Sequence, residues 1–208
     1  MAIDALRLTH ASPDARYPAN TTIGGRPYTL RLMTQDDAPL VITFGRSLSD
    51  DDQLYLRRDI TRVGEVNAWV RRLSPQSFQT LLLVDANGEV GAYANIDRSP
   101  IPWMHHVAEL RVLVGQPLRG LGTARLLTEE AFRVALEMGV EKIIGQLMVE
   151  QVDPIAIFRS LGFQPEALLR DHVKDRQGGL HDLVILSCQV GSLGSKLEMY
   201  GVTAALAD

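Results

Sequence analysis

The sequence contains little cysteine, no excess of positive charge and no long apolar run. Cys188 is the only cysteine among 208 residues, so no disulfide can form within the chain, which is typical of a reducing compartment. The formal net charge is −4, whereas a dedicated nucleic-acid binder needs a basic surplus. No apolar run approaches the roughly 20 residues of a membrane span, and residues 1–10 lack the basic start and apolar stretch of a signal peptide. We therefore expect a cytoplasmic protein with neither a nucleic-acid nor a membrane partner.

The length of the chain suits one domain with a substantial core. Residues 1–27 carry scattered Pro, Gly, Asn and Asp, so we expect an irregular N-terminal arm there. The folded domain is predicted over residues 28–190, and residues 191–208 are predicted to form a C-terminal tail.

The hydrophobic pattern predicts a mixed fold. Strands are predicted at residues 28–33, 78–84, 89–96, 107–114, 142–149, 163–169 and 183–188. Helices are predicted at residues 36–48, 65–73 and 154–161, and also directly after a glycine-rich turn near residue 120. The resulting order is strand, helices, three strands, helix, strand, helix and two strands. This order predicts an α/β (α+β) protein built around one mixed sheet.

The glycine-rich turn at residues 119–124 joins a predicted strand to a long amphipathic helix. Gly120 and Gly122 permit backbone conformations that other residues avoid, and the start of a helix leaves unpaired N–H groups. Together these features suit a pyrophosphate, to which Arg119 can add a charge-assisted contact. The dinucleotide fingerprint requires a third glycine where Arg125 stands, and no Walker triplet follows the turn. A tight turn that only starts a helix remains the alternative.

Two segments carry a resemblance to a known family. Residues 119–124 read Arg-Gly-Leu-Gly-Thr-Ala, which resembles the [Gln/Arg]-x-x-Gly-x-[Gly/Ala] signature of the GNAT N-acetyltransferase superfamily. Residues 158–163, Phe-Arg-Ser-Leu-Gly-Phe, look like the aromatic-x-x-Leu-Gly-Phe helix end of that family. The resemblance covers residues 28–188 in element order. It implies a mostly antiparallel, splayed sheet flanked by helices, with acetyl-CoA as cosubstrate in the cleft where two strands part, and no metal.

The resemblance also implies which residues bind the cofactor. In the family, main-chain groups of the strand before the loop pair with the pantetheine arm, and the loop N–H groups hold the pyrophosphate. An aromatic residue on the later helix flanks the arm. These implied cofactor-binding residues are Val112, Leu113, Val114, Arg119, Gly120, Leu121, Gly122, Thr123, Ala124 and Phe158.

The amino-terminal half is similar to the catalytic domain of bacterial protein lysine acetyltransferases. The similar stretches are residues 30–31, 34–39, 47–49 and 55–57. The resemblance implies transfer of an acetyl group from acetyl-CoA to a primary amine by direct attack, with a protein lysine as one acceptor. A small-molecule amine acetyltransferase, a non-catalytic acyl-CoA-binding or sensing module and a nucleotide-phosphate binder are the alternatives. A homodimer is left open.

Acetyl transfer to an ammonium group requires a base that removes a proton. Glu109 is the candidate, because it precedes Arg119 by the spacing at which the resembled subgroup places its glutamate base. A carboxylate on an apolar strand is expected to accept a proton more readily near neutral pH. The alternative is a strand-end glutamate in a surface ion pair. Phe158 stands where many relatives carry a tyrosine that protonates the leaving thiolate, so the general acid is not assigned.

Three further groups have a plain structural interpretation beside a functional one. Cys188 lies in an apolar strand and is expected to pack there rather than act as a nucleophile. His105 would share a strand face with Glu109, but no third ligand supports a metal site, and a loop role is favoured. Five arginines either favour an acidic acceptor or form a solvated face balanced by residues 50–52; they are Arg57, Arg58, Arg62, Arg71 and Arg72.

Overall fold

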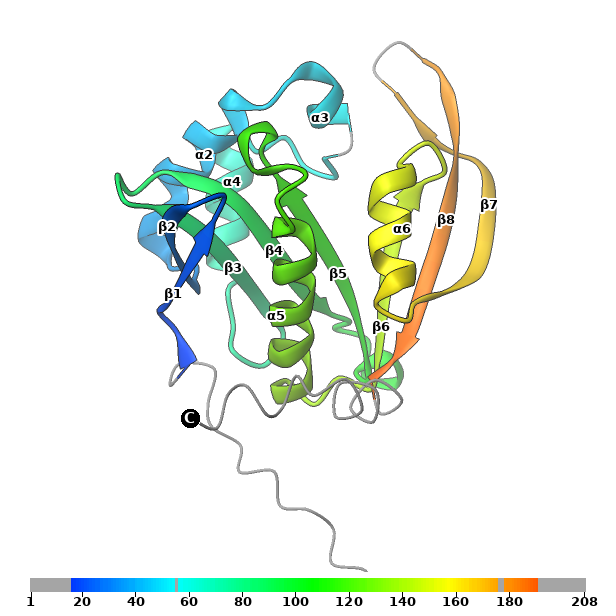
Figure 1. The fold of residues 1–208 in the computed structure, drawn as a ribbon. Coiled ribbons are helices and arrows are strands. Elements are labelled where there is room, and N and C mark those ends of the chain that lie inside the picture. The colour runs from blue at the N-terminus through cyan, green and yellow to red at the C-terminus, as the bar shows by residue number, and fades with distance from the viewer. Residues whose placement is uncertain (1–15, 55, 176–177, 191–208) are drawn as a thin grey trace, which may run out of the picture.

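The computed structural model describes residues 16–54, 56–175 and 178–190, and its centre is one eight-stranded sheet (Figure 1). The strands are β1 (Ala19–Ile23), β2 (Arg26–Leu32), β3 (Phe78–Asp85), β4 (Val90–Arg98), β5 (Val107–Val114), β6 (Lys142–Met148), β7 (Gln164–Lys174) and β8 (Leu180–Gln189). Their order across the sheet is β1-β2-β3-β4-β5-β6-β8-β7. All neighbours pair antiparallel except β5 and β6. The predicted mixed, mostly antiparallel sheet is confirmed.

Helices cover both faces of the sheet. They are α2 (Ala38–Ser47), α3 (Asp50–Leu54), α4 (Val63–Arg71), α5 (Thr123–Glu137) and α6 (Val152–Ser160), with short 3-10 turns at Gln35–Asp37, Pro102–Met104 and Gln116–Leu118. In Figure 1, α5 and α6 lie in front of the sheet, and α2 and α4 lie behind it. None of the described helices is long and apolar enough to cross a membrane.

The alternating side chains of β3 explain why helices cover both faces of the sheet. Leu81 and Leu83 pack in the core cluster that contains α5, whereas Leu82 and Val84 pack in the cluster that contains α2 and α4. Successive side chains of a strand point to opposite faces, so an uninterrupted apolar run buries both of them. The central sheet is thereby fixed between two helical layers.

The expected irregular arm is wrong for residues 19–27. These residues form β1, the turn at Gly24 and Gly25 with φ of 56° and 77°, and the start of β2. The β-branched sequence Thr21-Thr22-Ile23 suits a strand, and the two glycines permit the left-handed turn. Residues 1–15 of the predicted arm and the predicted tail at residues 191–208 lie outside the described residues.

The sheet splays between β5 and β6. Only Val107, Ala108 and Glu109 pair with β6, although both strands continue beyond these rungs. From Leu110 onward, the β6-facing edge of β5 is therefore not paired with β6. Figure 1 shows the two strands diverging, with α6 and β8 on the far side of the gap.

The contact between α2 and the segment before α4 leaves no room for a side chain at Gly45. A Cβ atom there would lie 2.8 Å from the Ile60 carbonyl oxygen, which is main chain and cannot rotate away. We expect Gly45→Ala to destabilise the protein by about 1–3 kcal/mol, which thermal unfolding would show as a fall in Tm of roughly 2–4 °C per kcal/mol. Gly64→Ala is the matched control, because a Cβ there meets nothing within 4 Å. Equal Tm values for the two variants would contradict the close contact.

Candidate functional site

A cavity of about 980 Å³ lies at the splay of the sheet. Its walls come from the α3–α4 region, β4, β5, the loop at residues 118–124, β6 and α6. All but one of the predicted cofactor residues line it, namely Val112, Leu113, Val114, Arg119, Gly120, Gly122, Thr123, Ala124 and Phe158. The exception is Leu121, whose half-exposed side chain packs beside Gly24. The structure thus brings together segments that the sequence predicts to share one ligand.

The glycine-rich loop presents unpaired amides at the mouth of this cavity. Gly120 and Gly122 have φ of 71° and 80°, and α5 begins at the next residue, Thr123. The Thr123 hydroxyl is buried and donates to the Leu118 carbonyl at 2.9 Å, which fixes the turn. Within the described residues, nothing accepts the main-chain N–H groups of residues 121–125. The combination of left-handed glycines and free helix N–H groups suits an anion.

Arg119 is already held in place. Its Nη2 atom lies 2.6 Å from Asp52 Oδ1, and its Nε atom donates to the Val114 carbonyl at 3.0 Å. Asp52 lies on α3, so this ion pair ties the helix to the glycine-rich loop. Both side chains line the cavity, and a bound polyanion would compete with Asp52 for the guanidinium.

The ladder between β4 and β5 determines which main-chain groups of β5 face the gap. The Gly115 N–H donates to Gly91 O at 2.9 Å, and the Ser99 N–H donates to Val107 O at 3.0 Å. Hydrogen-bonding direction alternates along a strand, so odd-numbered residues of β5 bond to β4. The amides of Val112 and Val114 therefore point into the gap. The main-chain groups of Leu113 point to β4 instead, and it is the side chain of Leu113 that lines the cavity.

Phe158 forms an apolar wall of the cavity. Its ring lies over Gly145 so closely that a Cβ there would be 2.6 Å from Cε1. The ring also packs against Phe163, with the two centroids 4.7 Å apart. The residue is buried and carries no proton to donate, so this wall supplies contact area and not acid chemistry.

Glu109 does not have the expected apolar surroundings. Its Oε2 atom accepts a hydrogen bond from Arg57 Nη1 at 2.7 Å, and its Oε1 atom accepts one from Arg111 Nη2. Arg57 and Arg111 line the cavity, while Glu109 lies directly behind them. The alternative of a paired strand glutamate describes this geometry better. A base role for Glu109 would require the exposed Arg57 side chain to move aside.

The sequence analysis missed a polar row on the cavity floor. Tyr93, Asn95 and Asp97 alternate along β4 and line the cavity on the face that α4 covers. Tyr93 and Asn95 are 8% and 6% exposed, and burial raises the pKa of Tyr93 to about 12. The signal was present in the strand, because polar side chains at every second position in an apolar run indicate one polar face.

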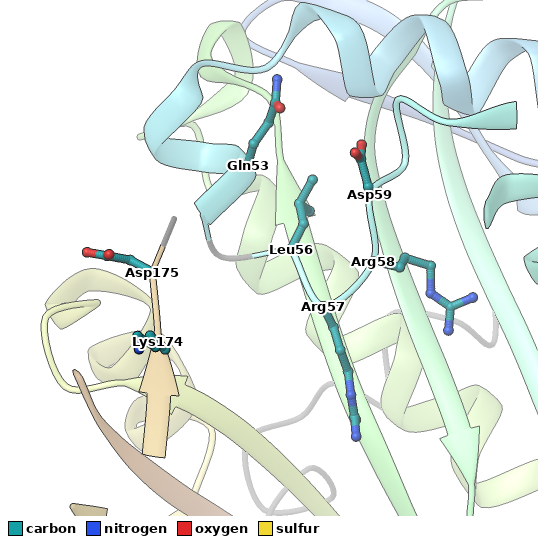
Figure 2. Close-up of a pocket in the computed structure, with 7 residues that line it drawn as sticks. All are labelled: Gln53, Leu56, Arg57, Arg58, Asp59, Lys174 and Asp175. Atoms are coloured by element: carbon teal, nitrogen blue, oxygen red, sulfur yellow. The ribbon is translucent and has the colours of Figure 1, made fainter. Parts of the chain in front are cut away.

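A second pocket of about 210 Å³ adjoins this floor. It lies between the segment before α4 and the end of β7, which contributes Lys174 and Asp175 to its lining (Figure 2). Arg57 and Arg58 line both pockets, and their side chains leave the segment in different directions (Figure 2). The two pockets therefore share part of one wall.

The five arginines divide into two groups. Arg57, Arg58 and Arg72 line the large cavity. Arg62, which pairs with Asp59 at 3.0 Å, and Arg71 are not part of its lining. The expected balance by residues 50–52 is wrong for Asp52, whose partner is Arg119. The three cavity arginines therefore lie on the wall of the cavity, although the side chains of Arg57 and Arg72 are also 61% and 48% exposed.

Cys188 and His105 take structural roles. Cys188 is buried in β8, as predicted. His105 lies in the turn before β5, where its Nε2 atom is 3.1 Å from the Pro100 carbonyl, so it does not share a strand face with Glu109. Within the described residues, no group of three His, Cys, Asp or Glu side chains is placed to hold a metal ion.

His181 links the β7–β8 hairpin to the cavity rim. Its Nε2 atom lies 3.1 Å from Asp175 Oδ2, and its Nδ1 atom lies 3.2 Å from Glu150 Oε1. Glu150 lines the large cavity, and Asp175 lines the smaller pocket. These carboxylates, Asp175 first, raise the pKa of His181 above its usual value. The imidazolium form therefore holds the hairpin to the rim.

This link makes part of the stability dependent on pH. Folding raises the pKa of His181. The stabilisation that His181 gives to the folded state is therefore fully present below the pKa of the unfolded chain, about 6.5, and is lost as pH rises through the pKa of the folded state. We expect the Tm of wild type to exceed that of His181→Gln most near pH 6, and the difference to shrink toward pH 9. The control is His172→Gln on β7, since His172 forms no ion pair within the described residues. A wild-type advantage over His181→Gln that is constant with pH would contradict the charged link.

Comparisons with known proteins agree with this geometry. The GNAT domain of S. lividans PAT matches with a TM-score of 0.71 and 22% identity, over 84% of this chain and 98% of that one. A ribosomal-protein-alanine N-acetyltransferase from Brucella melitensis matches with a TM-score of 0.67 and 24% identity, over 77% and 98%. A putative acetyltransferase from Salmonella typhimurium, solved with its cofactor acetyl-CoA, matches with a TM-score of 0.67 and 18% identity, over 82% and 95%.

No family model matches the sequence, and no curated protein does. The structural matches nevertheless establish the architecture. This chain has the fold of the GNAT acetyltransferases, with the splayed sheet and the glycine-rich loop that the resemblance implied.

Proposed function

We propose that this protein is an N-acetyltransferase that moves an acetyl group from acetyl-CoA to a primary amine. The observation that carries the proposal is the position of the free amides of residues 121–125 at the mouth of the cavity that passes through the splay. A pyrophosphate at these amides would direct the rest of coenzyme A along the unpaired edge of β5. The Val112 carbonyl and the Val114 N–H face that path and would pair with the amide-containing arm, since the Val114 carbonyl already accepts from Arg119.

The acetyl group would then lie near Leu110, next to the polar floor. An amine that enters over this floor would attack the thioester carbonyl directly. The Val112 N–H, which points into the gap, would stabilise the oxyanion of the tetrahedral intermediate. Collapse of this intermediate would break the C–S bond and release the coenzyme A thiolate, which takes a proton from solvent. Glu109 is the proposed base, acting on the ammonium group when Arg57 swings away from its Oε2 atom. Phe158 would pack against the arm and exclude water from one side.

A protein lysine is a second candidate acceptor. The structural likeness to the GNAT domain of S. lividans PAT favours it, together with the similarity of the amino-terminal half to protein lysine acetyltransferases. A non-catalytic acyl-CoA-binding module is the alternative outside enzyme chemistry.

The proposal is tested by release of free coenzyme A thiol from acetyl-CoA over a panel of amines and lysine peptides. Thermal shifts with acetyl-CoA, NAD and ATP report binding separately, since a ligand of the native state raises the apparent stability. We expect stabilisation by acetyl-CoA and amine-dependent turnover. Stabilisation without turnover on any amine would favour the binding module, and stabilisation by ATP or NAD alone would overturn the proposal.

A further inference from the structure

The polar floor of the cavity contains buried side chains that can donate hydrogen bonds. Asn95 and Tyr93 project from β4 on the side that α4 covers, and both are more than nine-tenths buried. Such polar groups are costly to bury unless they find partners. What remains unpartnered there indicates the ligand.

A directional relay fixes how the Asn95 amide points. Trp69 Nε1 lies 3.2 Å from Thr80 Oγ1, and Thr80 Oγ1 lies 3.0 Å from Asn95 Oδ1. An indole nitrogen can only donate, so the Thr80 hydroxyl accepts from Trp69 and gives its own proton to Asn95. The Asn95 carbonyl oxygen therefore faces Thr80. Its Nδ2 protons have no acceptor within the described residues and are available to the cavity.

Arg58 adds an unpaired cation above this floor. Its guanidinium carbon lies 5.4 Å from the centroid of the Trp69 ring, which holds it over the same aromatic side chain that starts the relay. Among the described residues, no carboxylate lies within ion-pair distance of Arg58. Burial and, after it, the neighbouring Arg72 lower the pKa of Arg58, and the opposing influence of Tyr93 and Asp97 does not offset them.

The surroundings of Arg58 do not supply the missing counter-charge. Arg72 is held by Asp97 at 3.0 Å, and Glu109 is shared between Arg57 and Arg111. Four guanidinium groups thus meet two carboxylates on this side of the cavity. An anionic ligand would be attracted there, and a polycationic acceptor would be repelled.

We propose that Arg58, Asn95 and Tyr93 bind a carboxylate of the acceptor, so that the substrate is a small primary amine that carries a carboxylate, such as an amino acid. The proposal rests on the function proposed above. The guanidinium, the amide N–H and the phenol are all donors to such a group. A small acceptor fits better than a protein lysine, because Tyr93 and Asn95 are only 8% and 6% exposed, so acidic side chains that flank a lysine on a protein surface would not reach them.

The test compares amino acids with the corresponding amino-acid amides, measured as kcat/KM for acetylation by the wild-type protein. We expect the amino acids to be preferred, and Arg58→Gln to reduce the ratio of the two kcat/KM values by about 10–100-fold. Arg62→Gln is the matched control outside the cavity, and it should keep the wild-type ratio. Equal use of acids and amides by wild type, an unchanged ratio in Arg58→Gln, or turnover on lysine peptides alone would each overturn the proposal.

A second variant guards against a simple folding defect. Asn95→Asp keeps the acceptor for the Thr80 proton and nearly the same shape, but it places a negative charge on the floor. We expect this variant to lose activity on amino acids while it gains relative activity on the amides. Retained preference for amino acids in Asn95→Asp would contradict the site.

Binding without turnover separates this proposal from the function on which it rests. N-acetyl-amino acids are the probes in thermal-shift titrations of wild type and Arg58→Gln, with N-acetyl-amino-acid amides as controls. If the N-acetyl-amino acids stabilise wild type but not Arg58→Gln, and the amides stabilise neither, the carboxylate site is supported. This holds even if acetyl-CoA neither binds nor turns over, because that result would reject only the transferase function. Equal shifts for acids and amides, or no shift at all, would overturn the site.

Discussion

Replacement of Glu109 by glutamine is expected to reduce kcat/KM for amine acetylation by about 10²–10⁴-fold, while the affinity for acetyl-CoA is retained. The substitution keeps the size of the side chain and removes the group that would accept the ammonium proton. Glu109 lies behind Arg57 and Arg111 and outside the lining of the cavity, so coenzyme A should bind as before. Steady-state kinetics and a calorimetric titration with acetyl-CoA measure the two quantities separately.

Glu166→Gln is the control for the loss of a charged pair on a strand. Glu166 lies on β7 and pairs with Lys142 at 2.7 Å, away from the cavity, and its removal should leave kcat/KM unchanged. If Glu109→Gln turned over acetyl-CoA as fast as wild type, Glu109 would be only the counter-ion of two arginines.

Gly122→Val is expected to weaken acetyl-CoA binding by about 10–100-fold, because each charge-assisted hydrogen bond from the loop contributes on the order of 1.5–3 kcal/mol. Gly122 has φ of 80° at the residue before α5, a conformation that a β-branched residue avoids. A Cβ there meets nothing within 4 Å, so the expected defect is backbone rearrangement and not a clash. Titration calorimetry with acetyl-CoA measures the affinity directly.

Gly88→Val separates backbone strain from loss of the binding loop. Gly88 has φ of 84° in the β3–β4 turn, also with nothing within 4 Å of a Cβ. Both variants should lose about 1–2 kcal/mol of folding stability to the left-handed conformation. Only Gly122→Val should lose affinity, and a similar loss in Gly88→Val would mean that general destabilisation explains both.

The sequence predicted those parts of the site that are formed by residues close together along the chain. The glycine-rich loop needs only Gly120, Gly122 and the helix that follows, so its spacing carries the geometry. The same is true of the end of α6, because Phe158 lies in the last turns of that helix and is positioned by it. The alternation of apolar residues likewise predicted most strands, because its period is set by the pleat.

The remainder depends on contacts between residues far apart in the chain. Glu109 meets Arg57 across 52 positions, and Asp52 meets Arg119 across 67, so neither pair has a spacing that a sequence pattern could reveal. The polar face of β4 is visible in the sequence, but the contacts from Trp69 through Thr80 to Asn95 span 11 and 15 positions and are not. In the same way, β1 was missed because its partner, β2, supplies the hydrogen bonds that order it.

The gap between β5 and β6 narrows to the three residue pairs that join the two strands, so these pairs close one end of the gap. A thioester with its phosphates at Gly122 would point its acyl group at this closed end, close to Leu110. Any donor with a long fatty chain would have to force apart paired main-chain groups, each hydrogen bond contributing about 1 kcal/mol. The length of the unpaired edge of β5, more than any single side chain, would then restrict the proposed transferase to short acyl groups.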